Sequence, residues 1–309
     1  MGGKLRQDRT RKRGAREPKK VASMKTIPLP PPVLLITIIV TVTLATISAF
    51  AANSDRPQTN SSPVLVELFT SEGCSSCPPA DALLKKLDAS QPIPGADVIV
   101  LSEHVDYWNH DGWKDVYSSG FFTDRQENYE RRLQVREPYT PQMVVDGAIQ
   151  LNGSDGPAAA RAINAARSHP KISVRIASVT VANPKTLQVH VQVDELPSDL
   201  KAGKADIFLA VALDHAESHV LAGENKGRDI QHVAVAASIN KVGTVDKTKN
   251  FDHEVLVKIP SGVDVANLRL VAFVQEVDGG YVLGAAPLDA PLKISRLALR
   301  RTDSGGAIE

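Results

Sequence analysis

The spacing of hydrophobic residues changes along the chain, and the change predicts two folded regions. Between residues 63 and 170, apolar runs typical of buried strands alternate with a segment whose apolar residues recur at i, i+3, i+4 and i+7, the spacing of one helix face. From about residue 171, apolar and polar residues alternate with a period of two, as in half-buried strands. The pattern predicts an α/β region followed by an all-β region.

The α/β region begins with two apolar runs that flank the helical pattern. We predict buried strands at Val64–Phe69 and Val98–Leu101, with a helix over Ala80–Leu87 between them. This order implies a right-handed parallel crossover. Asp146-Gly147, between two apolar runs, predicts a β-hairpin, and Ser154–Ser168 combines capping residues with a helix.

Short strands separated by turn signals continue through the all-β region. Asn183-Pro184 and Asp278-Gly279-Gly280 are such signals. Several short strands without a helical stretch indicate an antiparallel β-sandwich. The strands are predicted at Ile172–Ile176, Leu187–Val193, Ile207–Leu213, Val255–Ile259, Leu268–Glu276 and Tyr281–Ala285.

The N-terminal 52 residues have the pattern of a targeting segment. Residues 1–32 contain ten basic and two acidic side chains, and an apolar stretch over Val33–Phe50 ends in small residues. Together these features predict a signal peptide, with Met24 as an alternative start. The alternative is an uncleaved inner-membrane anchor, since the stretch is close to the length of a membrane span. Both interpretations, the signal peptide and the anchor, predict an exported protein, periplasmic or extracellular, whose only contact with the membrane would be through this segment.

Charge and cysteine content narrow the function classes. The overall charge is +1, but the basic N-terminus leaves the rest of the chain mildly acidic, which argues against nucleic-acid binding. Cys74 and Cys77 are the only cysteines, which excludes a disulfide-stapled scaffold and a four-cysteine zinc ribbon. The predicted organisation is a signal peptide or anchor at 1–52, a linker at 53–62, the α/β domain at 63–170, the β-sandwich at 171–294 and a flexible tail at 295–309.

The two cysteines lie between a predicted strand and a predicted helix. A helix N-terminus stabilises negative charge, so the pKa of Cys74 should fall below the free value of about 8.5 and make it the attacking thiolate. Cys77, three residues later, would resolve the mixed disulfide. An inert disulfide and metal ligation are the alternatives.

Cys74-Ser75-Ser76-Cys77 and Thr140-Pro141 resemble the thioredoxin superfamily. The resemblance implies a thioredoxin-like α/β domain and a cis Thr140–Pro141 bond that faces the cysteines. The backbone of Thr140 would then pair with an extended substrate segment. The alternative for Pro141 is an ordinary loop proline that starts a strand.

Over roughly residues 63–290 the chain is also similar to a family of secreted bacterial proteins of unknown function. The motifs that carry this similarity are Glu67–Asp81, His104–Trp108, Gly112–Asp115, Arg125-Gln126, Tyr139–Gln142, Gly223–Arg228 and Gln231–Val233. The segment Gly223–Arg228 has glycines on both sides of polar residues and predicts a turn between strands.

His104 and Asp106 follow the second predicted strand. The carboxyl ends of parallel strands lie at one sheet edge, so both residues should lie near the thiols. His104 could act as a base for Cys74, with Asp106 assisting, or complete a copper or zinc site with Cys74 and Cys77. The alternative is a histidine that orients the following loop.

Residues 104–137 are rich in aromatic side chains in an aromatic-poor chain, and they contain both tryptophans, Trp108 and Trp113. We predict a helical insertion. It could cap the thiol edge and contact substrate, or it could be a small subdomain with its own core. Two sets of ionisable residues are predicted outside the core, the first at solvated faces or in local ion pairs and the second at the surface or in hairpins. They are Asp115, Asp124, Arg125 and Arg132, and His215, His219, His232 and His253.

These features together predict an exported thiol–disulfide oxidoreductase that acts on protein thiols and disulfides of the cell envelope. The redox-active disulfide would be its only cofactor. Because there is no third cysteine, electrons must pass to or from a separate redox partner. The alternatives are a metal-binding or metallochaperone module and a non-catalytic envelope scaffold.

Overall fold

A computed structural model describes residues 61–288, which fall within one compact unit. The predicted targeting segment at 1–52 and the predicted tail at 295–309 lie outside these residues, as does most of the predicted linker. Of the described residues, 44% are in strands and 20% in helices. No helix within 61–288 is both long and apolar enough to cross a membrane.

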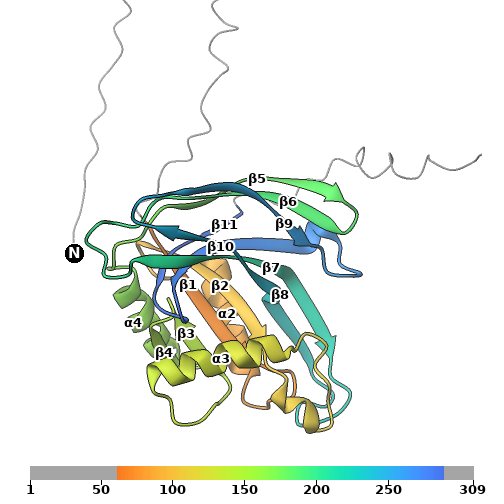
Figure 1. The fold of residues 1–309 in the computed structure, drawn as a ribbon. Helices are drawn as coiled ribbons and strands as arrows, with labels where there is room; N and C mark the ends of the chain where they lie inside the picture. The colour runs from red at the N-terminus through yellow and green to blue at the C-terminus, as the bar shows by residue number, and fades with distance from the viewer. Residues whose placement is uncertain (1–60, 289–309) are drawn as a thin grey trace, which may run out of the picture. The chain divides into compact units, whose positions relative to one another are not determined.

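Eight strands form one mixed sheet in the order β11-β10-β7-β8-β2-β1-β3-β4 (Figure 1). The β1–β2 and β2–β8 pairs are parallel and the others antiparallel. The strands are β1 (Ser62–Thr70), β2 (Ala96–His104), β3 (Gln142–Val145), β4 (Ile149–Asn152), β7 (Lys204–His219), β8 (Asp229–Asp246), β10 (Leu268–Glu276) and β11 (Val282–Pro287).

A second, three-stranded antiparallel sheet has the order β5-β6-β9. Its strands are β5 (Val174–Asn183), β6 (Thr186–Val193) and β9 (Phe251–Lys258), and they form a separate layer over β7 and β10 in Figure 1. The alternating apolar residues of β6 face this interface, where Leu187 and Val191 share a core with Leu209 of β7 and Leu270 of β10. The period of two therefore reflects burial of one sheet face.

Within residues 61–288, three α-helices cover both faces of the β1–β2–β3 part of the large sheet. They are α2 (Pro78–Ser90), α3 (Gly120–Leu133) and α4 (Gly156–Ala166), with short 3₁₀ turns at η1 (Tyr107–His110) and η2 (Val265–Asn267). Leu84 of α2 and Ile163 of α4 pack with Val66 and Val100 on one face. Phe122 of α3 packs on the other face, because successive side chains of a strand point to opposite sides.

The predicted fold class is wrong. The sequence suggested a thioredoxin-like α/β domain with a helical insertion, followed by a separate β-sandwich. Instead, one large sheet contains strands from both sides of residue 170. The cause is β8, the longest strand, which the sequence pattern missed. It pairs with β7 along its length and with β2 at Ser102–Val235, so it connects the two halves. Its residues His232–Ala236 are all buried, which hides the period of two.

The aromatic segment 104–137 is also not an independent helical insertion. It contributes η1 and α3, and the buried side chains of α3 belong to the core of the main sheet. Phe122 packs with Leu65 and Leu101, and Tyr129 packs with Phe69.

Several local predictions are confirmed. The helix after the cysteines, the parallel β1–β2 pair and the helix capped by Asp155 all form. Asp146 and Gly147 have φ values of 47° and 66°, as the tight turn between β3 and β4 requires.

Candidate functional site

The loop between β1 and α2 carries a disulfide. The Sγ atoms of Cys74 and Cys77 are 2.16 Å apart and their Cα atoms 5.4 Å apart. Cys77, rather than Cys74, is the N-cap residue of α2, and prolines fill the first positions of the helix, where backbone N–H groups have no helical partner. Both cysteines are fully buried, whereas Ser75 and Ser76 between them are exposed.

The predicted cis bond between Thr140 and Pro141 is confirmed, and it lies beside the disulfide loop. Ser76 Oγ donates to the Thr140 carbonyl oxygen at 3.4 Å and lies 3.3 Å from Cys74 Sγ. Trp108 Nε1 donates to Thr140 Oγ1 at 2.7 Å. These contacts bring four predicted site residues, Cys74, Trp108, Thr140 and Pro141, to one place.

A group of buried ionisable side chains lies behind the loop. We call Glu72, Asp81, His104, Asp115 and His232 the cysteine-side cluster. Asp115 Oδ2 accepts from the backbone N–H of Glu72 at 2.9 Å and lies 2.7 Å from His104 Nδ1. Burial would raise the pKa of Asp115, but His104 and the backbone donors outweigh burial and lower it. Asp115 therefore stays ionised and fixes the backbone next to Gly73.

His232 lies between two carboxylates of this cluster. Its Nε2 is 3.6 Å from Glu72 Oε1 and its Nδ1 is 3.6 Å from Asp81 Oδ1, distances that indicate ion pairing without hydrogen bonds. Burial opposes the charge on His232, but the two carboxylates outweigh burial and raise its pKa to about 9. An imidazolium inside the protein thus balances carboxylates on both sides of the disulfide loop.

Trp113 is tied to the same cluster, since its Nε1 donates to Glu72 Oε2 at 2.7 Å. Burial would raise the pKa of Glu72, yet His232 and the Trp113 donor contribute to lowering it. Asp106 is not part of the site. Its Oδ1 accepts from Thr123 Oγ1 at 2.7 Å, which links the end of β2 to the first turn of α3.

The tip of the β7–β8 hairpin reaches the disulfide loop from the other half of the chain (Figure 1). Glu224 Oε2 accepts from the backbone N–H of Ser75 at 3.1 Å. The Asn225 side-chain amide donates to the carbonyl oxygens of Glu72 and Cys74, at 2.8 and 2.9 Å. The predicted turn at 223–228 is confirmed, and it is part of the site.

With the disulfide formed, His104 has a structural contact, to Asp115, and no hydrogen bond to either cysteine. It is fully buried, its Nδ1 contacts Asp115, and its Nε2 has no hydrogen-bond partner. The structure therefore does not join His104 to Cys74 and Cys77 as a ligand set. Within residues 61–288, no group of three or more His, Cys, Asp or Glu side chains is arranged to hold a metal ion.

A second ionic group, the α3-side cluster, lies on the opposite face of β1 and β2. It consists of Glu67, Glu103, Arg125, Tyr129 and Gln275. Arg125 Nη2 is 2.5 Å from Glu67 Oε1, and Arg125 Nε is 3.4 Å from Glu103 Oε2. Tyr129 OH donates to Glu67 Oε2 at 2.6 Å, and Gln275 Nε2 donates to Tyr129 OH at 2.8 Å. Burial and the neighbouring Glu67 raise the pKa of Glu103 well above its ordinary value.

Three ionisable residues are thus less exposed than the sequence suggested. Asp115 and Arg125 were predicted at a solvated face or in local ion pairs, and His232 at the surface or in a hairpin. Asp115 and Arg125 do form ion pairs, but the three side chains are only 0%, 10% and 1% exposed. Sequence reasoning also missed the roles of Glu224 and Asn225. The signal available for these two was the motif similarity at 223–228.

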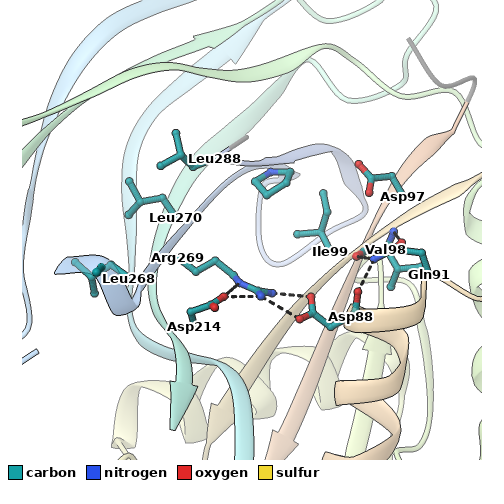
Figure 2. A pocket seen from close by; sticks show the side chains of 12 residues that line it. Asp88, Gln91, Asp97, Val98, Ile99, Asp214, Leu268, Arg269, Leu270 and Leu288 are labelled. Carbon is teal, nitrogen blue, oxygen red and sulfur yellow. Dashed lines mark hydrogen bonds and ion pairs between the residues drawn. The ribbon is translucent and has the colours of Figure 1, made fainter. Parts of the chain in front are cut away.

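A pocket of about 360 Å³ lies at the far end of α2 from the disulfide (Figure 2). Arg269 crosses it and pairs with Asp88 at 2.7 Å and with Asp214 at 2.6 Å. Because two carboxylates already neutralise this guanidinium, the pocket offers a weaker case for chemistry than the disulfide loop.

Comparison with known proteins establishes the family. Residues 65–275 match the family described as "Protein of unknown function (DUF1223)", and the chain belongs to that family. No curated protein matches the sequence.

Two solved structures are similar in fold. A crystal structure of a protein from Agrobacterium tumefaciens is 27% identical, with a TM-score of 0.56 over 75% of this chain and 97% of that chain. HBP35 of Porphyromonas gingivalis is 13% identical, with a TM-score of 0.52 over 76% of this chain and 79% of that chain. At 13% identity, the similarity to HBP35 concerns the fold alone.

Proposed function

We propose that this protein exchanges disulfides with the thiols of other proteins through Cys74 and Cys77. The observation that carries the proposal is a disulfide at the start of α2, beside the cis Thr140–Pro141 bond. These two elements resemble the thioredoxin superfamily, and we take from that resemblance the thiol chemistry and not the fold.

In the oxidising direction, a substrate thiolate attacks Sγ of Cys74. The Cys74–Cys77 bond breaks, Cys77 leaves as a thiolate, and a mixed disulfide forms. A second substrate thiolate then attacks the substrate sulfur of that mixed disulfide. The substrate gains a disulfide and loses two electrons, and the Cys74–Cys77 pair is reduced. A separate redox partner must then reoxidise the pair, and the reducing direction runs through the same steps in reverse.

The burial of both cysteines sets a condition on this reaction. Because Cys74 and Cys77 are fully buried, an attacking thiol can reach the Cys74 sulfur only after neighbouring residues move away from it. Ser75 and Ser76 are exposed, and Ser76 contacts the Thr140 carbonyl. A substrate segment that paired with the backbone of Thr140 would compete for this contact. We therefore assign Thr140 to substrate binding, with Trp108 positioning it.

Export and protein substrates of the cell envelope are part of the proposal. The basic and apolar pattern of residues 1–52, outside the described residues, supports export.

The test is a redox titration of the protein against glutathione, read by the mass shift on alkylation of both cysteines. We expect a reversible midpoint between about −120 and −270 mV, the range of catalytic dithiols. A disulfide that stays intact below about −300 mV would be a structural link and would contradict the proposal.

A second experiment identifies substrates. Cys77→Ser should trap mixed disulfides through Cys74, whereas Cys74→Ser/Cys77→Ser should trap none. Protection of both reduced thiols from alkylation by Zn²⁺ or Cu⁺ would favour the metal-binding alternative instead.

A further inference from the structure

The tip of the β7–β8 hairpin packs closely against the segment Asp111–Trp113. Gly223 has φ +73°, and a Cβ atom there would lie 3.0 Å from the Asp111 carbonyl oxygen and 3.2 Å from Trp113 Cβ. A side chain at this position would both strain the backbone and push the tip away. The glycine thus allows the close approach that brings the next two residues to the cysteines.

Those two residues contact the disulfide loop in different ways. Asn225 is fully buried, and its amide holds the carbonyl groups of Glu72 and Cys74. Glu224 is exposed, and its carboxylate accepts the backbone N–H of Ser75, the residue after Cys74. Asn225 therefore fixes the shape of the loop, while Glu224 places a negative charge on it.

A negative charge at this place opposes the reduced state of Cys74. A thiolate that precedes a helix is stabilised by free backbone N–H groups and by the positive end of the helix dipole. Glu224 occupies the N–H of Ser75, and its charge repels a thiolate at Cys74. The hydrogen bond to Ser75 lowers the pKa of Glu224, so the carboxylate stays ionised at neutral pH. The cysteine-side cluster supplies the buried ionisable groups next to the loop, and Lys226 and Arg228 are exposed basic residues on the same hairpin tip as Glu224.

We propose that Glu224 is a positioning residue that biases the Cys74–Cys77 couple toward the disulfide by disfavouring a thiolate at Cys74. This inference rests on the proposed function. In the equilibrium concerned, the disulfide and two glutathione molecules give two protein thiols and one glutathione disulfide. The protein pair gains two electrons and two protons from glutathione, and the Cys74 thiol then loses one proton to solvent where it ionises. Glu224 acts on this ionisation, because its charge repels the thiolate and so lowers the share of the reduced protein at equilibrium.

The test uses the whole chain with Glu224→Gln, which keeps the size of the side chain and removes its charge. The equilibrium with glutathione should shift toward the dithiol by about three- to tenfold, and tenfold corresponds to about 30 mV. In the reduced protein, the alkylation rate of Cys74 against pH should show a lower thiol pKa. The shift should shrink at high ionic strength, because Glu224 is exposed and salt screens it.

Glu217→Gln is the matched control. Glu217 is an exposed carboxylate of β7 on the same hairpin, opposite Gln231, so the net charge changes equally at a position other than the one that contacts Ser75. The inference predicts that Glu217→Gln behaves as the unchanged protein. Equal midpoints for the two variants, or a shift of Glu224→Gln toward the disulfide, would overturn it.

The two proposals fail in distinguishable ways. A midpoint below about −300 mV in the unchanged protein contradicts the exchange function. A stronger dithiol reductant would then replace glutathione, and the comparison of the two variants would still decide the role of Glu224. A midpoint in the catalytic range with no effect of Glu224→Gln contradicts the inference alone.

Discussion

The two faces of strands β1 and β2 each bury an ionic cluster, and the clusters differ in how their charges are balanced. In the cysteine-side cluster, the His232 imidazolium lies between the carboxylates of Glu72 and Asp81. In the α3-side cluster, one guanidinium, that of Arg125, faces both Glu67 and Glu103. In the second cluster, burial and the neighbouring Glu67 raise the pKa of Glu103 well above its ordinary value, so that carboxyl holds its proton more strongly than an exposed glutamate does.

The difference teaches that buried charge alone does not mark a functional site. Both clusters perturb pKa values, as active sites do. The α3-side cluster, however, holds a helix and a sheet together, with Arg125 near the rings of Tyr129, Phe208 and Phe273. The cysteine-side cluster instead adjoins a reactive group and an exposed loop. It is therefore the contact with the disulfide that carries the functional argument.

The largest expected change in stability follows from removing Arg125, the cation that Glu67 and Glu103 share in the α3-side cluster. Arg125→Met should leave the buried Glu67 uncompensated and lower the free energy of unfolding by about 3–5 kcal/mol. Urea unfolding measures this effect. Arg131→Met is the control on the same helix, because Arg131 is exposed and its pair with Glu127 contributes about 1 kcal/mol or less. A loss below about 1 kcal/mol for Arg125→Met would show that this cluster does not stabilise the fold.

The next effect tests the charge of the cysteine-side cluster through pH. A histidine whose pKa rises from 6.5 to about 9 on folding stabilises the protein fully below pH 6.5, and this contribution disappears as pH rises through 9. Relative to the unchanged protein, His232→Gln should lose about 3 kcal/mol at pH 6 and much less near pH 10. The groups that face His232 are Glu72, Asp81, His104 and Tyr117. If the stability difference between His232→Gln and the unchanged protein stayed constant from pH 6 to 10, His232 would not carry the charge that balances Glu72 and Asp81.

A third prediction concerns the pH dependence of the α3-side cluster, which has the same sign but begins at lower pH. Above the ordinary glutamate pKa of 4.5, the unfolded chain loses the Glu103 proton at a lower pH than the folded protein does, because the pKa of Glu103 is raised on folding. Stability therefore falls as pH rises, by up to about 1.4 kcal/mol per pH unit. Glu103→Gln should remove this slope, and unfolding measured from pH 4 to 8 checks it. Exposed Glu127→Gln is the control, and parallel curves of stability against pH for both variants would contradict the raised pKa of Glu103.

The smallest effect tests whether the cis-proline loop is held by the aromatic segment. Trp108→Phe removes the hydrogen bond to Thr140 Oγ1 and should cost about 0.5–1.5 kcal/mol. A double-mutant cycle with Thr140→Val isolates the pair. A coupling energy of zero would mean that Trp108 does not help to position Thr140.

Local features of the fold were predictable because neighbouring residues decide them. Asp146-Gly147 adopts positive φ angles at both positions and makes a tight hairpin, and the prolines after Cys77 begin α2. The strand β8 was not predictable in the same way. It is central in the sheet and buried on both faces around His232–Ala236, so its sequence lacks the alternation of a half-buried strand.

The sequence by itself placed the two cysteines between a strand and a helix, and the resemblance to the thioredoxin superfamily implied the cis Thr140–Pro141 bond. Only the tertiary structure decided which charges surround the pair. Glu224, Asn225 and His232 lie about 150 residues after the cysteines, and β8 brings them there by pairing with both β7 and β2. A pKa depends on burial and on charges within a few ångströms, and such neighbours are set by strand pairing between distant segments rather than by local sequence.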